Sequence, residues 1–281
     1  SSFDVFVKDL NPGIVLFDRF LTEEQFGWRV VEHCPNALRI LDTEDLHSLR
    51  HVREQCFKKG IDFTTDAWLQ DDKTKREIAS IYRCDLSLII SSFEFELLTE
   101  IIKIDKSLLL LLPFMVNEIA QKTKWKTFED RNDFMFIGGG KHAPNIDAIK
   151  VLKTTLWPLI HAQLPEAKLN IYGAYLPQQV VEMHNPKEGF LVKGRAKDAD
   201  EVMKAAKVCL APLRFGAGIK GKLLCAMQNG TPSVTTTIGA EGMHGILDWN
   251  GTIENGHTTF VKAVVTLYTE PKTWKIAQEQ G

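Results

Sequence analysis

The sequence lacks the features that mark several special classes of protein. Its five cysteines are scattered and form no Cys-x-x-Cys pair, which argues against a disulfide framework and against a zinc site. Basic and acidic residues number 34 and 36, so the net charge of -2 gives no global attraction to nucleic acid. The longest apolar run, residues 108–114, is far below the ~20 residues of a membrane span. The acidic pairs show no metal-ligand spacing, so we expect no metal site.

The N-terminus shows no signal sequence, and the chain begins Ser1-Ser2 without a methionine. Together with the scattered cysteines, this predicts a cytoplasmic protein. The chain also has no low-complexity tract and no internal repeat. Its 281 residues are enough for one large or two ordinary domains.

What the sequence does contain is an alternation of short apolar strands and helices. This pattern predicts an α/β protein with parallel sheets that carry helices on both faces. The strands expected in the first half are residues 14–17, 38–41, 86–90 and 108–112, and the helices are 22–32, 46–59 and 75–83. In the second half the expected strands are 134–137, 168–172, 190–192, 209–212 and 232–235, and the helices are 145–164, 198–206, 222–228 and 260–268.

The alternation is interrupted once, by the polar and charged stretch 122–133, which we interpret as a linker. We therefore predict two Rossmann-like lobes with a cleft between them. The N-terminal lobe would span residues 1–130 and the C-terminal lobe residues 131–281.

The most informative stretch runs from Val208 to Met243, VCLAPLRFGAGIKGKLLCAMQNGTPSVTTTIGAEGM. An apolar strand leads into a glycine turn with Gly216 and Gly218, and a small-residue helix follows. Glycines let backbone N–H groups approach an oxyanion closely, and a helix N-terminus adds roughly half a positive charge. Lys220 and Lys222 add full charges at the same place. The pattern predicts a diphosphate site at the C-terminal edge of a parallel sheet.

Four motifs in this stretch carry a family resemblance. The string Pro212-Leu213-Arg214-Phe215-Gly216-Ala217-Gly218-Ile219-Lys220-Gly221-Lys222 is followed by Ala226-Met227, Gly230-Thr231-Pro232 and Gly239-Ala240-Glu241-Gly242. Together they resemble the donor-site region of the group 1 (family-4-like) retaining glycosyltransferases, which have the GT-B fold. The resemblance implies a nucleotide-diphosphate-sugar donor, UDP- or GDP-linked, and no cofactor or catalytic metal.

The resemblance also implies that the first lobe is incomplete. Group 1 transferases open with a strand and a glycine-rich loop that meet the acceptor, and this chain begins after that element. The acceptor would be a glycan, a lipid or a protein, and peripheral association with a membrane is compatible with this class.

The cations of the glycine turn are the first candidate site residues. By the resemblance, Lys222 meets the donor diphosphate, and Lys220 occupies a position that Arg or Lys often holds. Arg214 is a candidate third cation. The alternative is that these side chains are simply solvated near a helix start, but a positive charge there is unfavourable against the dipole unless an anion is bound.

Further strand ends of the second half are expected to line the donor site. Gly138, Gly139 and Gly140 follow a strand, and the family has a similar glycine loop that faces the phosphates. Gly173, Gly194 and Arg195 end two further strands, which in the family line the nucleobase pocket. A tight turn alone would also explain these glycines. For Asn145, helix capping is the expected role.

Cys225 is a departure from the family pattern. Related transferases carry a glutamate directly before Ala-Met, which accepts hydrogen bonds from the ribose hydroxyls. A thiol is a poor acceptor. Losing a hydrogen bond to a charged acceptor costs ~1.5–3 kcal/mol, which is roughly a ten- to hundredfold loss of donor affinity. Glu241 is a candidate for the sugar hydroxyls, with a solvated loop carboxylate as the alternative.

In the first half, the string Asp42-Thr43-Glu44-Asp45-Leu46-His47 places acids and a histidine after a strand. By the resemblance His47 contacts the transferred sugar, and histidine is the usual side chain for proton transfer near neutral pH. The alternative is a helix N-terminus with acids in its first turn.

The function predicted is metal-independent, retaining transfer of a sugar from a nucleotide-diphosphate donor to an unknown acceptor. His47 and Lys222 are its expected catalytic residues. The alternatives are an inactive sugar-nucleotide-binding or accessory subunit, which Cys225 favours, and a sugar-nucleotide epimerase.

Overall fold

The computed structural model describes residues 2–116 and 125–281, and its chain forms two compact units. Unit 1 consists of Ser1–Met115, Phe215–Ile219 and Glu241–Met243. Unit 2 consists of Val116–Arg214, Lys220–Ala240 and His244–Gly281. The first three residues of the expected linker, 122–124, lie outside the described residues, and the boundary at residue 130 stays a prediction.

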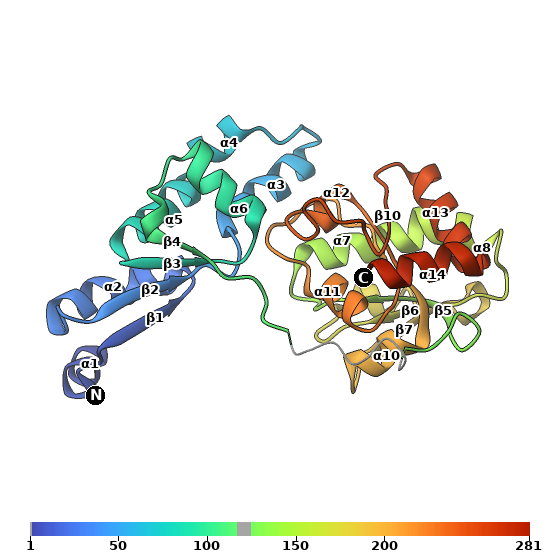
Figure 1. Cartoon of the computed structure of the whole chain (residues 1–281), viewed down its shortest axis with the longest axis horizontal. Helices are drawn as coiled ribbons and strands as arrows, with labels where there is room; N and C mark the ends of the chain where they lie inside the picture. Colours follow the sequence, from blue (N-terminus) through green and yellow to red (C-terminus); the bar gives the residue numbers. More distant parts are fainter. Residues whose placement is uncertain (1, 117–124) are drawn as a thin grey trace. The chain divides into compact units, whose positions relative to one another are not determined.

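Unit 1 is built on a four-stranded parallel sheet with the order β1-β2-β3-β4. Its strands are β1 (Ile14–Asp18), β2 (Leu38–Asp42), β3 (Leu86–Ile89) and β4 (Leu109–Leu111). Its helices are α1 (Phe3–Leu10), α2 (Phe20–His33), α3 (His47–Lys59), α4 (Thr65–Gln70), α5 (Asp72–Arg83) and α6 (Ser92–Glu96), which continues as a π-helical turn over Leu97–Ile101. Figure 1 shows α3, α5 and α6 on the same side of this sheet.

The two faces of the unit 1 sheet differ in burial. The face with the odd-numbered residues is covered: Phe17, Leu41 and Ile89 are at most 2% exposed. On the opposite face, Ile14 is 62% and Leu16 56% exposed. The strand register places apolar side chains along this second face, namely Ile14, Leu16, Leu38, Ile40, Leu86, Leu88 and Leu110. We call these seven residues the open face of unit 1.

Unit 2 contains a six-stranded parallel sheet with the order β10-β9-β8-β5-β6-β7. Its strands are β5 (Asn132–Ile137), β6 (Leu169–Tyr172), β7 (Phe190–Gly194), β8 (Ala206–Ala211), β9 (Ser233–Thr235) and β10 (Gly251–Ile253). Its helices are α7 (Ala143–Val151), α8 (Trp157–His161), α9 (Gln178–Val181), α10 (Ala199–Ala205), α11 (Gly221–Gln228), α12 (Thr237–Ala240), α13 (His257–Thr269) and α14 (Pro271–Gln280). A π-helical turn over Leu152–Leu156 joins α7 to α8.

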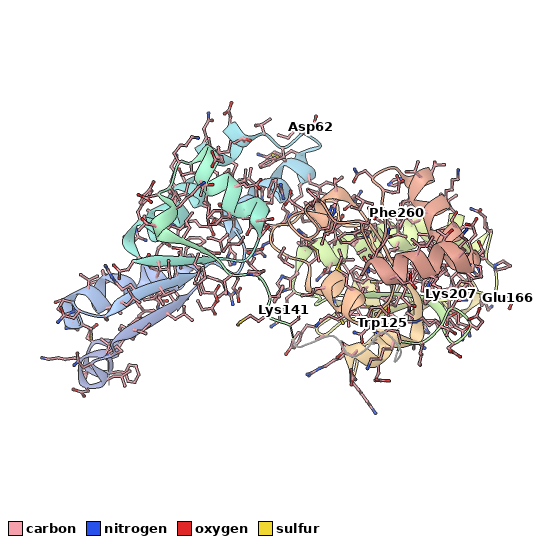
Figure 2. The ribbon with its side chains drawn as sticks, viewed as in Figure 1. Asp62, Trp125, Lys141, Glu166, Lys207 and Phe260 are labelled. Carbon is pink, nitrogen blue, oxygen red and sulfur yellow. The ribbon has the colours of Figure 1, made fainter. Side chains whose placement is uncertain are left out.

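The core of unit 2 is rich in aromatic residues. Phe134 of β5 is fully buried, and its ring centroid lies 5.9 Å from that of Trp157 and 4.5 Å from that of Tyr268. Phe260 of α13, which Figure 2 labels, is 2% exposed in the same cluster. This cluster fixes α8 and α13 on one face of the sheet, while Met135 of β5 packs on the other face in a separate cluster with Met203 of α10 and Ala226 of α11.

Arg131 is fully buried in unit 2 without a carboxylate partner among the described residues. Its guanidinium donates to the carbonyls of Met203 and Ala206 at the end of α10, at 3.4 and 3.3 Å, and to Asn229 O at the end of α11, at 2.8 Å. Burial lowers the pKa of Arg131 to about 10, so the group stays charged at neutral pH. One cation thus joins the negative ends of two helices.

The predicted fold class is confirmed, and each strand expected from the sequence is present. The sequence missed α1, α4, α6, α9, α12 and α14, and it missed the three-residue strand β10. It also predicted one helix over residues 145–164, whereas the structure has a π-helical turn between α7 and α8.

Candidate donor-binding site

The strand order of unit 2 determines where a ligand crevice can form. The chain passes from β5 outward to β6 and β7, then returns to β8 on the other side of β5. In open α/β sheets the crevice lies outside the carboxyl ends of the strands where the order reverses. Here that point lies between β5 and β8, so α7 and α11, which follow these strands, flank it.

Lys222 lies in the first turn of α11 and reaches across to α7. Its Nζ donates to Asn145 Oδ1 at 2.6 Å and lies 5.0 Å from the centre of the Phe136 ring. Burial lowers the pKa of Lys222 to about 8. A cation at a helix N-terminus opposes the helix dipole, and no carboxylate contacts Lys222 within the described part of the chain. The position suits a bound anion.

Asn145 connects Lys222 to the glycine loop. Its Nδ2 donates to Gly139 O at 3.0 Å while its Oδ1 accepts from Lys222. The expectation that Asn145 caps its helix was wrong: His142 is the N-cap residue of α7, and Asn145 lies inside the first turn. Capping signals depend on sequence neighbours alone, whereas this amide is used by a lysine 77 residues away.

Two glycines allow the loops that follow β5 and β6 to pack closely. A Cβ atom on Gly140 would lie 2.2 Å from Tyr175 O, and one on Gly173 would lie 2.2 Å from Gly138 O. Backbone atoms cannot move aside at such distances, so both positions exclude a side chain. Within this loop, Gly138 N and Gly140 N donate to Tyr172 O and Ala174 O, at 3.0 and 2.8 Å, so Gly139 N is the loop N–H group without an acceptor among the described residues.

A pocket of about 450 Å³ opens at the carboxyl ends of β6 and β7. Gly173, Tyr175, Gly194 and Arg195 are among its lining residues, so the structure brings the residues predicted for the nucleobase into one place. The Lys141 ammonium, labelled in Figure 2, lies 4.4 Å from the centre of the Tyr175 ring. The volume is in the range of small-ligand sites.

The other two predicted cations have different surroundings. Lys220 stands at the N-cap position of α11 and is 8% exposed. The Arg214 guanidinium pairs with Asp147 of α7, with Nε 2.8 Å from Oδ2. A carboxylate therefore already balances the charge of Arg214, while the roles of both residues toward a diphosphate stay predictions.

Cys225 lies one turn after Lys222 on α11. Its Sγ is 3.4 Å from Asp200 Oδ1 of α10, and Asn229 Nδ2 donates to the same oxygen at 2.8 Å. Burial, and then the neighbouring Asp200, raise the pKa of Cys225 to about 11, so the thiol stays protonated. A carboxylate from another helix thus lies beside the position where the family has its glutamate. Sequence reasoning missed Asp200, because no local signal marks it.

In unit 1, His47 is the first residue of α3. Its Nε2 lies 3.1 Å from Asp45 Oδ1, and its ring makes an edge contact with Phe20 at 6.1 Å between centroids. Burial lowers the pKa of His47 to about 4, an effect that Asp45 only partly offsets. The imidazole is therefore neutral at pH 7 and suited to hydrogen bonding, while its catalytic role stays a prediction.

The N-terminus of α3 is capped by a buried carboxylate that the sequence did not reveal. Glu77 of α5 accepts from the backbone N–H groups of His47 and Ser48, at 2.9 and 3.0 Å, and from Ser48 Oγ at 2.6 Å. Burial raises the pKa of Glu77 to about 7. These N–H groups thus have an internal acceptor and are not available to an external anion.

The remaining predicted residues lie in the segments assigned to unit 1. Gly216 O accepts from Arg53 Nη1 at 2.9 Å, and Gly218 N donates to Glu94 Oε1 at 2.8 Å. The Glu241 carboxylate forms a two-point ion pair with Arg53, at 2.7 and 2.8 Å, and its side chain is 13% exposed. Glu241 is therefore not a solvated loop carboxylate, and its role toward sugar hydroxyls stays a prediction.

Over the described ranges 2–116 and 125–281, no group of three His, Cys, Asp or Glu side chains is arranged to hold a metal ion. Within the same ranges, each helix is too short or too polar to cross a membrane.

Comparison with known proteins identifies the fold. The chain resembles solved structures in fold: Staphylococcus aureus TarM (TM-score 0.71, 14% identity), the pneumococcal O-GlcNAc transferase GtfA (0.72, 16%) and sucrose-phosphate synthase from Thermosynechococcus elongatus (0.71, 18%). Each match covers 99% of this chain, and 54%, 55% and 70% of the respective solved chains. The chain thus spans about half the length of the first two.

These matches define the fold as two Rossmann-like lobes of the GT-B type. Residues 131–270 match the family model described as glycosyl transferases group 1. Residues 131–270 therefore form a group 1 glycosyl transferase domain. No curated protein matches the chain significantly.

Proposed function

We propose that this chain binds a nucleotide-diphosphate sugar in unit 2 and transfers the sugar, with retention, to an acceptor that its sequence does not identify. One observation carries the proposal. At the β5–β8 reversal, a lysine at a helix N-terminus faces a glycine loop, and a pocket opens at the next strand ends. Phosphates and a nucleobase require these two features side by side.

The reaction breaks the bond between the sugar and the diphosphate, so negative charge develops on the leaving diphosphate. Lys222, the N-terminus of α11 and the backbone N–H group of Gly139 would stabilise that charge. Because burial lowers the pKa of Lys222 to about 8, an arriving diphosphate would raise that pKa again and hold the ammonium charged. This is electrostatic preorganisation, and it requires neither a cofactor nor a metal ion.

The donor would carry UDP or GDP. The solved structures of TarM and GtfA are complexes that contain UDP, so a UDP-linked donor is the first to test. For the acceptor, a glycan, a lipid or a protein stays open, with peripheral membrane association as part of the same proposal. We also propose a cytoplasmic location, since a reducing compartment suits five free cysteines.

Calorimetric titration of the chain with UDP and with GDP tests the proposal. We expect one of them to bind and Lys222→Ala to weaken that binding. Lys262→Ala, an exposed lysine on α13, is the matched control and should bind like the parent. Absence of binding by the parent, or equal binding by parent and Lys222→Ala, would show that unit 2 does not hold a working donor site.

The chemistry is tested separately. Release of the nucleoside diphosphate from UDP- or GDP-hexoses is measured in the presence of a chelator, with water or a sugar as acceptor. Turnover that persists supports metal-independent transfer, and NMR of the product's anomeric proton reports retention or inversion. Turnover that stops with the chelator and returns with a divalent cation contradicts metal independence.

A further inference from the structure

Three polar side chains lie along one face of α11. Their order along the helix matches the order of diphosphate, ribose and base in a nucleotide. Lys222 and Cys225 are three residues apart, and the C-cap residue Asn229 follows four residues later, so all three lie along one side of the helix. One helical turn advances by about 5.4 Å. In a nucleoside diphosphate the ribose hydroxyls lie about one such step from the phosphates, and the base lies beyond.

Asp200 lies beside the second step of this series. Its Oδ1 accepts from Asn229 Nδ2 at 2.8 Å and lies 3.4 Å from Cys225 Sγ. No hydrogen bond of the described residues involves its Oδ2, and the residue is exposed. The carboxylate is thus held by one oxygen while the other faces solvent.

The connection to the base pocket comes from the chain itself. Arg195 lines the pocket, and α10 begins four residues later, after its N-cap residue Asp198. Asp200 therefore belongs to the segment that leads from the pocket to α11, where Lys222 lies. In the chain, Asp200 thus follows Arg195 of the base pocket and precedes Lys222, while in space its carboxylate lies beside Cys225 and Asn229 of α11.

We propose that Asp200 accepts hydrogen bonds from the ribose hydroxyls of the donor and thereby determines specificity for a ribonucleotide. This proposal rests on the proposed function. Cys225 leaves the site without an acceptor of its own, because a thiol donates weakly and accepts poorly. Asn229 and Cys225 instead orient the Asp200 carboxylate, which retains an oxygen for the ligand. The ligand class is a ribonucleoside diphosphate, selected against its 2′-deoxy counterpart.

Calorimetry with UDP, GDP and the two 2′-deoxy nucleoside diphosphates tests this assignment. In the parent we expect the ribonucleotide to bind roughly tenfold or more tightly than its deoxy form, since a hydrogen bond to a charged acceptor is lost. Asp200→Asn keeps the shape of the side chain and should remove most of that preference. It should weaken ribonucleotide binding and leave deoxynucleotide binding nearly unchanged.

Glu201→Gln is the matched control, because Glu201 is the next, equally exposed acid of α10 and pairs with Lys204. It should keep the parent's preference. The role of Asp200 is overturned if Asp200→Asn weakens binding of the ribonucleotide and the deoxynucleotide equally, or weakens neither. In both cases, binding that depends on Lys222 would still support the donor site. Absence of Lys222-dependent binding in the parent overturns the donor site and Asp200's role together.

A second variant makes the assignment independent of Asp200→Asn alone. Cys225→Glu would place a second carboxylate beside Asp200, and like charges at this distance oppose each other. We expect Cys225→Glu to gain little affinity by itself and to gain clearly more in the Asp200→Asn background. An equal gain in both backgrounds would show that Asp200 does not act at the ribose.

Discussion

The two sheets of this chain are both parallel, yet they differ in how the chain passes through them. In unit 1 the strands follow each other in chain order, β1-β2-β3-β4. In unit 2 the order reverses between β5 and β8. Parallel crossovers are right-handed, so strands added in one direction place their helices on one face, and a reversal places the next helices on the other.

This difference accounts for the burial of each sheet. Phe134 and Phe136 of β5 are fully buried on one face of the unit 2 sheet, and Met135 between them is 1% exposed on the other face, because helices cover both faces. The open face of unit 1, by contrast, consists of leucine and isoleucine side chains with exposures up to 62%. A parallel sheet is normally covered on both faces, and its sequence keeps the apolar pattern for that reason.

The difference also locates the chemistry. In open α/β sheets the ligand crevice forms where the strand order reverses, and the described part of unit 1 has no such reversal in its sheet. The candidate anion site and the base pocket both lie in unit 2. In unit 1 the comparable helix N-terminus, that of α3, is filled by Glu77.

The largest expected effect comes from the doubly covered sheet. Phe134→Ala removes a fully buried ring that packs against Trp157 and Tyr268. We expect unit 2 to lose about 3–5 kcal/mol of its free energy of unfolding. Urea unfolding followed by tryptophan fluorescence measures this. A loss below about 1 kcal/mol would contradict the packing described for this face of the unit 2 sheet.

The next effect tests whether the ligand crevice belongs to unit 2 alone. Lys222→Ala should weaken binding of the nucleoside diphosphate roughly ten- to hundredfold, since a charged hydrogen bond is lost. Arg76→Ala, an exposed cation of unit 1 that pairs with Glu24, should leave binding unchanged. Calorimetry of both variants compares the units directly. A larger loss in Arg76→Ala would reverse the assignment.

A pH titration tests whether binding requires the charged ammonium of Lys222. The pKa of Lys222 is lowered to about 8, so its ammonium is mostly charged at pH 7 and mostly neutral at pH 9. Binding that needs the charged form should weaken about tenfold over this interval. Lys222→Arg stays charged throughout and should bind with an affinity independent of pH. A parent affinity equal at pH 7 and 9 would exclude Lys222 as the main cation.

The smallest effect is expected on the open face of unit 1. Leu16 is 56% exposed, so Leu16→Lys should change the free energy of unfolding by no more than about 0.5 kcal/mol. The same variant should reduce the fluorescence of a dye that binds exposed apolar surface. Destabilisation of about 2 kcal/mol or more would mean that Leu16 is buried and that the two sheets are packed alike.

Much of the fold followed from local sequence patterns. The strands were found because apolar runs end at glycine or at a change of polarity, as Phe134–Ile137 ends at Gly138. Strand β10 was missed because three residues between Asn250 and Glu254 carry no period. Helix α1 lay before the first recognised strand, so the alternation of strands and helices gave no reason to expect it.

The candidate site was also predicted only in part from the sequence. The glycine turn with Lys220 and Lys222 is contiguous in sequence, and so it was recognisable. The partners that give these residues their geometry are distant in sequence: Asn145 is 77 residues from Lys222, and Asp200 is 25 residues from Cys225. Such pairs depend on the strand order, which a single sequence does not reveal.

Arg131 has a consequence for how this site can be measured. Its partners are backbone carbonyls and one hydroxyl, which do not titrate, and its own pKa of about 10 lies above the range of the Lys222 titration. The joint between α10 and α11 therefore keeps the same protonation state between pH 7 and 9. Arg131 itself has no carboxylate partner among the described residues, so salt has no ion pair of this guanidinium to screen. Changes in affinity between pH 7 and 9 therefore report on the groups that face the ligand, because the protonation state of Arg131 does not change over this interval.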